Sequence, residues 1–328
     1  MRFQALLIMA LFLCLQSSAR GQERVRIAWA GASPNNAPIW VVEERKLLKK
    51  HGLDGEIISI SISASTIALQ ALMAGDLDVT VTSVTSVVPS RSGGADTVLI
   101  LGMVPSFPDY IVTIPAITTV EQLRGKNGGV NRLGSTSDLG IRLALRKLGI
   151  DPDRDAKIFS IGAAPERFAA LSKGVIQFTT ISEPFVREAE KLGFRTLVSL
   201  NSLKIPFWYN AVLSREATIK TKRPVLLKLT RAMMESVHFI KTQREATKAI
   251  FAKKMRITDN ESLERAYRDF APIFPENLLP TPDGVKTLLD DLAPKNPKLV
   301  GADPKSFIDL SLVQEVEASG FVKQLYQR

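Results

Sequence analysis

Hydrophobic and polar positions follow the same pattern at two places in the chain. Residues 71–80 read ALMAGDLDVT and residues 170–179 read ALSKGVIQFT, with identical residues at four positions. Each copy predicts the end of a helix and then a glycine, which can take the left-handed conformation that closes a helix. The apolar run after the glycine is typical of a strand in a buried sheet. The repeat predicts two lobes of the same construction, with a chance similarity between helix–glycine–strand junctions as the alternative.

A serine follows each copy at the same offset. Ser83 and Ser182 each stand three residues after the shared threonine. Open α/β sheets bind ligands at the carboxyl ends of their strands. These two hydroxyls are therefore predicted to face a common ligand, one from each lobe.

The first lobe is predicted to alternate strands with helices. The expected strands are 25–29, 56–62, 77–81 and 97–103, and the expected helices are 37–51, 63–74 and 84–90. This alternation favours parallel strands joined by helical crossovers. Prolines at positions 105, 108 and 115 interrupt the pattern around residues 110–113, which predicts a crossing into the second lobe there.

The second lobe continues the alternation and the rest of the chain is helical. Strands are expected at 128–130, 156–161, 175–179 and 194–200, and helices at 118–126, 139–148, 165–173 and 185–192. Residues 206–213 are interpreted as the strand that returns to the first lobe. After Pro224 apolar residues recur at helical spacing, and further helices are predicted from a Thr258-x-x-Glu261 cap and from Thr281. This block has no strands, so it is expected to pack against the first lobe.

Chain length predicts a division into domains. A chain of 328 residues exceeds what one hydrophobic core usually serves. We expect an α/β protein of two lobes, each a mostly parallel sheet flanked by helices. The first lobe is predicted to comprise residues 22–107 and 207–328, and the second residues 108–206.

The first 21 residues have the pattern of a secretory signal peptide. One basic residue precedes the apolar run 5–15, and small residues allow cleavage after Ala19 or Gly21. The run is shorter than the roughly 20 residues of a spanning helix. Export to the periplasm is therefore predicted. Cys14, the only cysteine, lies inside this segment, so the mature chain is expected to lack disulfides and thiolate metal sites.

The balance of charges favours anionic small molecules over nucleic acid. The formal net charge is +10, of which the predicted signal peptide carries two. A basic surface attracts anions. The basic residues are dispersed without interleaved aromatic residues, so nucleic-acid binding is not expected.

A run of hydroxyls precedes the predicted helix 139–148. Ser135, Thr136 and Ser137 add rotatable donors to the unpaired N–H groups of a helix start, which suits an anionic or polar ligand. The alternative is structural, because Ser135-x-x-Asp138 resembles a capping box.

Three other polar and aromatic residues can be interpreted either as ligand-binding or as structural. Glu183 at a predicted strand end can accept hydrogen bonds from a ligand or cap the next helix, and the cap is favoured. Trp208 and Tyr209 either line a cleft between the lobes or pack as part of a buried strand.

The histidines do not indicate catalysis. His51 and His238 are both predicted on helices outside the cleft elements, and they do not have metal-ligand spacing. We expect no enzyme activity, no cofactor and no metal.

In its order of elements the chain resembles the type II periplasmic substrate-binding proteins of ABC importers, from about Arg24 to the end. The features that carry the resemblance are A-L-x-x-G-x-L-D-V at residues 71–79, G-S-T-S-D at 134–138 and the helical C-terminal block. The similar branch includes binding proteins for nitrate, taurine, alkanesulfonates and thiamine-precursor pyrimidines. Fungal relatives that make the thiamine pyrimidine use iron, a sacrificial histidine and a cysteine-rich motif, and the mature chain has no cysteine.

The resemblance implies a two-lobed monomer that closes on a small solute by hinge bending and delivers it to a permease in the inner membrane. It also implies contacts from the loop after the first strand, the second helix start, the third strand end and the second lobe's helix start. With the candidates above, the expected ligand-binding residues are Ser33, Asn35, Asn36, Trp40, Ser63, Ser65, Thr66, Thr82, Ser83, Ser135, Thr136, Ser137, Ser182, Glu183, Trp208 and Tyr209.

Ligand identity stays open between two classes. Hydroxyl-rich strand ends and the basic chain favour a small anion, with a sulfonate as the first hypothesis. Trp40, Trp208 and Tyr209 favour an aromatic or heterocyclic ring, such as a thiamine-pyrimidine precursor. A further alternative to transport is a ligand-sensing partner of a membrane receptor.

Overall fold

The computed structural model describes residues 23–60 and 65–327. The predicted signal peptide therefore lies outside the described residues. Within the described residues, no helix is both long and apolar enough to cross a membrane.

The first of two sheets contains strands from distant parts of the chain. Its order is β2-β1-β3-β10-β4, and the strands are β1 (Glu23–Ala30), β2 (Leu53–Ile60), β3 (Val79–Thr82), β4 (Thr97–Val104) and β10 (Asn210–Arg215). β1 pairs in parallel with β2 and β3, whereas β10 runs antiparallel to β3 and β4. We call this sheet and the elements packed on it lobe 1.

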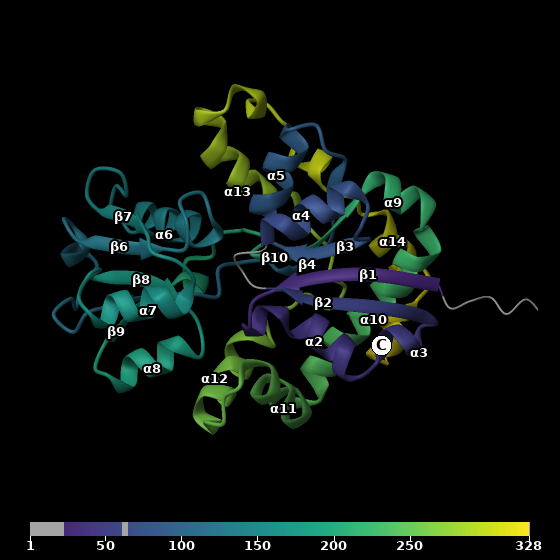
Figure 1. Cartoon of the computed structure of the whole chain (residues 1–328), viewed down its shortest axis with the longest axis horizontal. Coiled ribbons are helices and arrows are strands. Elements are labelled where there is room, and N and C mark those ends of the chain that lie inside the picture. Colours follow the sequence, from purple (N-terminus) through teal and green to yellow (C-terminus); the bar gives the residue numbers. More distant parts are fainter. Residues whose placement is uncertain (1–22, 61–64, 328) are drawn as a thin grey trace, which may run out of the picture.

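The second sheet repeats the first. Its order is β7-β6-β8-β5-β9, formed by β5 (Tyr110–Thr113), β6 (Asn127–Val130), β7 (Lys157–Ser160), β8 (Phe178–Ile181) and β9 (Arg195–Ser199). β6 is parallel to β7 and β8, and β5 is antiparallel to β8 and β9. Both sheets are thus mixed, with parallel pairing confined to three strands of each. We call this sheet and its helices lobe 2, which lies to the left of lobe 1 in Figure 1.

The repeat in the sequence corresponds to a repeat in the structure. β3 and β8 are the middle strands of their sheets. Gly75 and Gly174 both have positive φ, +85° and +70°, and close the preceding helix as predicted. The equivalence extends to the residue before each strand. The Asp78 carboxylate accepts from the Arg26 N–H at 2.9 Å, and the Gln177 amide oxygen accepts from the Asn127 N–H at 3.0 Å.

Most helices lie where the apolar spacing places them. Those of lobe 1 are η1 (Pro34–Asn36), α2 (Ala37–Glu44), α3 (Leu47–Lys50), α4 (Ser65–Ala74) and α5 (Val84–Ser92), and those of lobe 2 are η3 (Glu121–Leu123), α6 (Thr136–Lys147), α7 (Ala164–Ser172), α8 (Phe185–Lys191) and η4 (Leu200–Leu203). The single helix predicted over 37–51 is wrong, because Lys46 takes a left-handed conformation, φ +53°, and separates α2 from α3. This break lets Leu47 and Leu48 point into the core.

The C-terminal block is helical and packs mainly on lobe 1, as expected. It comprises α9 (Glu216–Thr221), α10 (Arg223–Thr242), α11 (Arg244–Met255), α12 (Asn260–Phe270), α13 (Pro282–Leu292), η5 (Ala293–Lys295), η6 (Pro297–Leu299), η7 (Pro304–Phe307), α14 (Ser311–Ala318) and α15 (Phe321–Leu325). α10 and α11 pack on α2, and α13 packs on α5. The predicted cap of α12 is displaced by one residue, because Asp259, and not Thr258, accepts from the Ser262 N–H.

Two segments connect the lobes. The chain leaves β4 at Val104 and enters β5 at Tyr110, so residues 110–113 form a strand of lobe 2 and the crossing precedes them. It returns between η4 and β10. The aromatic run 207–209 belongs to this return segment and precedes the strand, because β10 begins only at Asn210. The two segments are joined by hydrogen bonds from the Phe207 N–H to the Pro105 carbonyl, 3.1 Å, and from the Tyr209 N–H to the Val104 carbonyl, 2.9 Å.

Candidate functional site

A cavity of about 260 Å³ lies between the lobes at the carboxyl ends of β3 and β8. Lobe 1 and the return segment contribute Ala30, Ser33, Asn35, Val81, Thr82, Ser83, Thr85, Ser86, Tyr209 and Asn210, and lobe 2 with the outgoing crossing contributes Asp109, Asn131, Arg132, Gly134, Ser135, Thr136, Ser137, Ala163, Ala164, Arg167 and Ser182. The two serines that follow the repeat copies are both among them. Ten of the lining residues carry a hydroxyl, so the wall is rich in groups that can donate or accept.

The loop after β1 is shaped by Asn36. Its amide donates to the Ala30 and Gly31 carbonyls at 2.9 and 3.0 Å, and its oxygen accepts from Asn210 at 3.0 Å. Asn36 is buried and holds the loop, so it lies behind the cavity wall. Asn35 lines the cavity, and its side-chain oxygen is buried without a hydrogen-bond partner among the described residues. That oxygen is available to accept from a ligand.

The start of α5 forms the next part of the wall. Ser83 is the N-cap residue of α5: its hydroxyl accepts from the Thr85 N–H and donates to the Trp208 carbonyl, both at 3.3 Å. Thr82 pairs with Ser86 at 3.1 Å. Thr85 and Thr136 are 3.3 Å apart and bring α5 of lobe 1 to the start of α6 in lobe 2. The lobes therefore meet at this cavity.

The capping box predicted at α6 is not formed. Ser135 is the N-cap residue, but its side chain does not accept from the first turn. Instead Asp138 accepts from the Gly134 N–H at 2.8 Å, and Ser137 accepts from the Asn131 N–H at 2.9 Å. These contacts fix the loop and leave the N–H groups of the first turn without a side-chain cap. A helix start of this kind favours anions through its partial positive charge.

Two buried ionisable residues of the wall, Asp109 and Arg167, escaped the sequence analysis. Arg167 on α7 donates to the Gly162 and Thr180 carbonyls at 2.9 and 3.0 Å, and its Nε has no partner among the described residues. Burial lowers the pKa of Arg167, while Asp109 raises it. A signal was present in the sequence, because Arg167 stands one helical turn before Leu171, on the apolar face of the predicted helix.

Asp109 lies at the end of the crossing from lobe 1. Burial raises the pKa of its carboxyl, whereas the Arg167 charge and hydrogen bonds from Tyr209 and Ser182 lower it. Burial likewise raises the pKa of the Tyr209 hydroxyl, and the Asp109 charge raises it further. Asp109 had no sequence signal, because its neighbours in the cavity come from distant parts of the chain.

The remaining candidates from the sequence do not line this cavity. Trp40 is fully buried against Trp29 and Phe251, with ring centroids 5.9 and 6.0 Å apart. Trp208 is buried too, and its indole donates to the Thr281 carbonyl at 2.9 Å. In both cases burial of a large apolar ring in lobe 1 decided the position, and of the three aromatic candidates only Tyr209 faces the cavity.

Glu183, Thr66, Ser63 and Ser65 complete the set. Glu183 faces Arg265 of α12. The helix cap favoured for Glu183 is wrong, because Pro184 is the N-cap residue of α8 and no side chain caps this helix. Thr66 is exposed outside the cavity. Ser63 lies outside the described residues, as does the side chain of Ser65.

The chemistry of the cavity is that of a binding site. It contains two guanidinium groups, one carboxylate, many hydroxyls and a helix start, and no histidine is among its lining residues. His51 instead pairs with Glu235 at 2.8 Å, and His238 packs on Tyr326. Among residues 23–60 and 65–327, no three His, Cys, Asp or Glu side chains are grouped as a metal ion would require.

Comparisons with known proteins agree with the fold. Residues 115–255 match the model of the NMT1-like family. The periplasmic aliphatic sulphonate binding protein SsuA from Escherichia coli is similar in structure, with a TM-score of 0.72 and 21% identity over 88% of this chain and 92% of that one. The alkanesulfonate-binding protein SsuA from Xanthomonas axonopodis pv. citri, bound to MOPS, has a TM-score of 0.68 and 18% identity, over 84% of this chain and 94% of that one. The periplasmic nitrate-binding protein NrtA from Synechocystis PCC 6803 has a TM-score of 0.66 and 12% identity, over 94% of this chain and 89% of that one.

No curated protein sequence matches the chain. The structural similarities show that this chain has the periplasmic binding protein fold, as its element order indicated. The similar structures named here are described as binding proteins.

Proposed function

We propose that the protein is an extracytoplasmic solute-binding component of an ABC importer, which captures a small anion between its lobes. The observation that carries the proposal is the cavity itself: hydroxyls from both lobes, the uncapped start of α6 and the free Nε of Arg167 converge on one space. These groups can donate hydrogen bonds, and charge-assisted hydrogen bonds stabilise a bound anion. Arg132 adds a second positive charge to the wall.

The size of the cavity favours a small solute. Its volume of about 260 Å³ lies just below the range of roughly 300–1,000 Å³ that is typical of drug-sized ligands. A short alkanesulfonate or carboxylate meets both the size and the charge. Sulfonate is the first hypothesis, because its three oxygens can accept from several donors at once.

Asp109 favours a second candidate, a solute that carries an amino group beside its acid group. A carboxylate in the wall repels an anion but attracts an ammonium group. A zwitterion would place its acid group at α6 and its amino group near Asp109. A heterocycle is a third candidate and depends on the Tyr209 ring, the one aromatic side chain of the wall.

Delivery to a permease and export through the inner membrane are part of the same proposal. They rest on the resemblance to importer components and on the signal-peptide pattern of residues 1–21. Sensing through a membrane receptor is the alternative. Gene neighbours that encode a permease and an ATPase would favour transport.

The test is a thermal-shift and calorimetry screen of the chain from residue 22 against ethanesulfonate, 2-aminoethanesulfonate, acetate, nitrate and a pyrimidine. A ligand that binds the folded state alone raises the melting temperature. We expect ethanesulfonate or its amino derivative to bind, and Ser135→Ala and Arg167→Lys to weaken binding. Thr66→Ala is the matched control and should leave affinity unchanged. If only uncharged or purely cationic compounds stabilise the protein, the anion proposal is wrong.

A further inference from the structure

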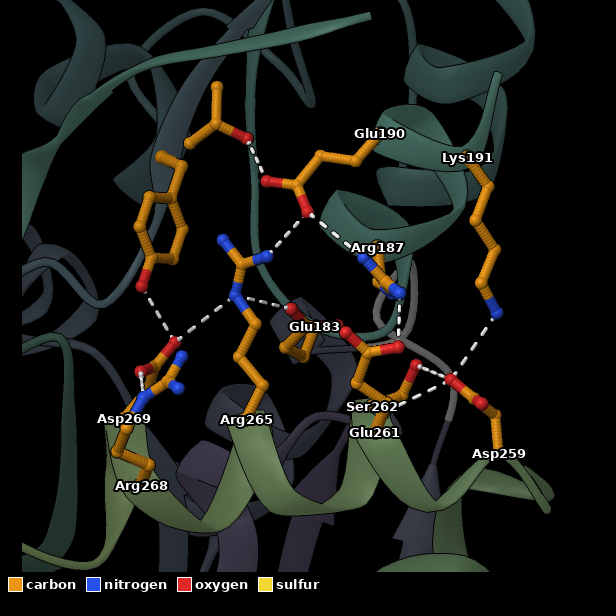
Figure 2. A network of polar contacts seen from close by, with 12 residues as sticks. Glu183, Arg187, Glu190, Lys191, Asp259, Glu261, Ser262, Arg265, Arg268 and Asp269 are labelled. Carbon is orange, nitrogen blue, oxygen red and sulfur yellow. Dashed lines mark hydrogen bonds and ion pairs between the residues drawn. The ribbon is translucent and has the colours of Figure 1, made fainter. Parts of the chain in front are cut away.

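A second contact between the lobes lies away from the cavity, between α8 of lobe 2 and α12 of the C-terminal block. Figure 2 shows charged side chains from both helices reaching toward one another. α12 also packs on α11 and on η1, beside the loop that carries Ser33 and Asn35. The contact therefore joins lobe 2 to a helix that is anchored on lobe 1.

Arg265 is the centre of this contact. Its Nη1 donates to Glu190 Oε2 at 2.6 Å, and its Nε lies 3.0 Å from Glu183 Oε1. Its guanidinium carbon also lies 5.2 Å from the centroid of the Tyr110 ring, within cation–π range. All three partners belong to lobe 2. One side chain from α12 thus contacts α8, β5 and the end of β8.

Further pairs surround Arg265. Tyr110 donates to Asp269 of α12 at 2.6 Å, and Lys191 pairs with Asp259 at 3.3 Å. Arg187 pairs with Glu261 at the outer edge. The Lys191–Asp259 and Arg187–Glu261 pairs are more exposed and contribute little on their own, whereas Asp269 is only 15% exposed. Glu183 differs from them, because its side chain is 0% exposed.

The charges at the centre do not balance without Arg265. Glu183, Glu190 and Asp269 are three carboxylates within 4 Å of its guanidinium. Removing one partner of a buried ion pair leaves an uncompensated charge, which is costly. Without Arg265 the two carboxylates of lobe 2 would also repel Asp269 of α12. Separation of the lobes would relieve both penalties by admitting water.

The contact is connected to the cavity through β8. Ser182 and Glu183 are neighbours after this strand, and Ser182 lines the cavity and bonds Asp109 while Glu183 faces Arg265. An arrangement of the lobes that brings Ser182 to the solute therefore brings Glu183 to Arg265.

We propose that Arg265, with Glu183 and Glu190, forms a clasp between the lobes that stabilises the closed arrangement and so prolongs solute retention, although Arg265 does not line the cavity. This inference rests on the proposed solute-binding function. Arg265 is a positioning residue, because it affects the solute only by stabilising the closed arrangement of the lobes and does not touch the solute. Closing raises affinity in proportion to the closed fraction.

The clasp has an expected pH dependence. Burial raises the pKa of Glu183 from 4.5 to about 7, with Asp269 and Glu190 adding to the rise and the Arg265 charge and the Arg187 N–H opposing it. In the open arrangement, with water around Glu183, its pKa is expected near 4.5. A raised pKa means that protonation favours the closed arrangement. The closed arrangement is therefore most favoured below about pH 4.5, where Glu183 is neutral, and becomes less favoured as pH rises through about 7, where Arg265 offsets the charge of the buried Glu183 carboxylate.

The experiment compares Arg265→Gln with Arg268→Gln, a control on the same helix whose side chain is 68% exposed and pairs at 3.4 Å with Asp269 of α12 itself, so that this pair does not join the lobes. The chain from residue 22 has no cysteine, so Val175→Cys in lobe 2 and Val300→Cys in lobe 1, both exposed, accept a pair of fluorescent labels. Energy transfer then reports the separation of the lobes without solute. We expect Arg265→Gln to lengthen the distance and Arg268→Gln to leave it unchanged.

Two further readouts complete the test. Combining Arg265→Gln with Glu183→Gln removes the unpaired charge of the Glu183 carboxylate and should shorten the distance between the two labels again. Glu183→Gln alone should make this distance independent of pH between about 5 and 8. For any solute found in the screen, Arg265→Gln should raise Kd about tenfold through faster release. An unchanged distance in Arg265→Gln overturns the clasp. Because this measurement needs no solute, its failure is separate from a failure of the screen.

If Arg265→Gln does not fold, the proposal is tested by measuring the label distance between pH 5 and 8 in the parent chain and in Glu183→Gln. A parent distance that stays constant from pH 5 to 8, or one that Glu183→Gln does not alter, then contradicts the proposal. Melting temperature identifies such a folding failure before the distances are compared.

Discussion

Phe107 and Phe207 stack face to face where the two connecting segments cross, with ring centroids 4.4 Å apart and an interplanar angle of 9°. One ring comes from the segment that leaves lobe 1 and the other from the segment that returns. Both side chains are almost fully buried. Tyr209 meets Phe107 edge-on at 6.1 Å, so the stack continues to the cavity wall. The two connecting segments therefore pack on one another within a hydrophobic cluster that includes residues of both lobes.

Phe107→Ala is expected to destabilise the protein by about 3–5 kcal/mol, because truncation of a buried phenylalanine leaves a cavity and removes the stack. Urea denaturation of the parent and variant gives the difference in free energy of unfolding. Phe159→Ala on β7 is the control: its ring is 45% exposed, and a loss below about 1 kcal/mol is expected. Equal losses in the two variants would contradict the structural role of the stack.

Asp109 predicts how solute affinity changes with pH. Burial raises the pKa of its carboxyl, and an anion in the cavity favours the protonated form. Affinity for a plain anion should therefore fall as pH rises through that raised pKa, while affinity for a solute with an ammonium group should rise. Calorimetry with ethanesulfonate and 2-aminoethanesulfonate between about pH 5 and 8 distinguishes these cases.

Asp109→Asn is the control for this titration. It keeps the shape and removes the charge, so the slopes of the two solutes with pH should become equal, and the slope that is left should be that of Glu183. Opposite slopes that persist in the variant would assign the difference to another group.

Asp78 and Gln177 occupy equivalent positions in the two copies of the repeat, but their truncation to alanine is expected to destabilise the protein to different extents. Asp78 is buried, accepts from the Arg26 N–H and pairs with Lys222 at 2.7 Å, whereas Gln177 in the other copy makes a neutral bond to the Asn127 N–H. Bonds to charged groups contribute about 1.5–3 kcal/mol and neutral ones about 0.5–1.5 kcal/mol. Asp78→Ala should therefore lower the free energy of unfolding by more than Gln177→Ala does, as measured by urea denaturation. The opposite ranking would show that the Lys222 pair adds nothing.

The sequence by itself determined the elements that depend on local spacing. The helix–glycine–strand repeat predicted β3 and β8, and the apolar stripe after Pro224 predicted α10, because both signals lie within one element. The order of elements was enough to identify the fold. The positions of Ser83 and Ser182 at one cavity also followed from the sequence, because equivalent strand ends lie at equivalent edges of two similar sheets.

Only the tertiary structure decided which side chains meet across the lobes. Asp109, Arg167 and Tyr209 come from a crossing, a helix and the return segment, and no spacing in the sequence joins them. Trp40 and Trp208 were placed by the burial of large rings in lobe 1, which competes with exposure in a cleft. Glu183 was turned toward Arg265, more than eighty residues away, because a buried carboxylate requires a cation. Periodicity is local and fixes elements, whereas charge pairing and packing act between elements and need their arrangement in space.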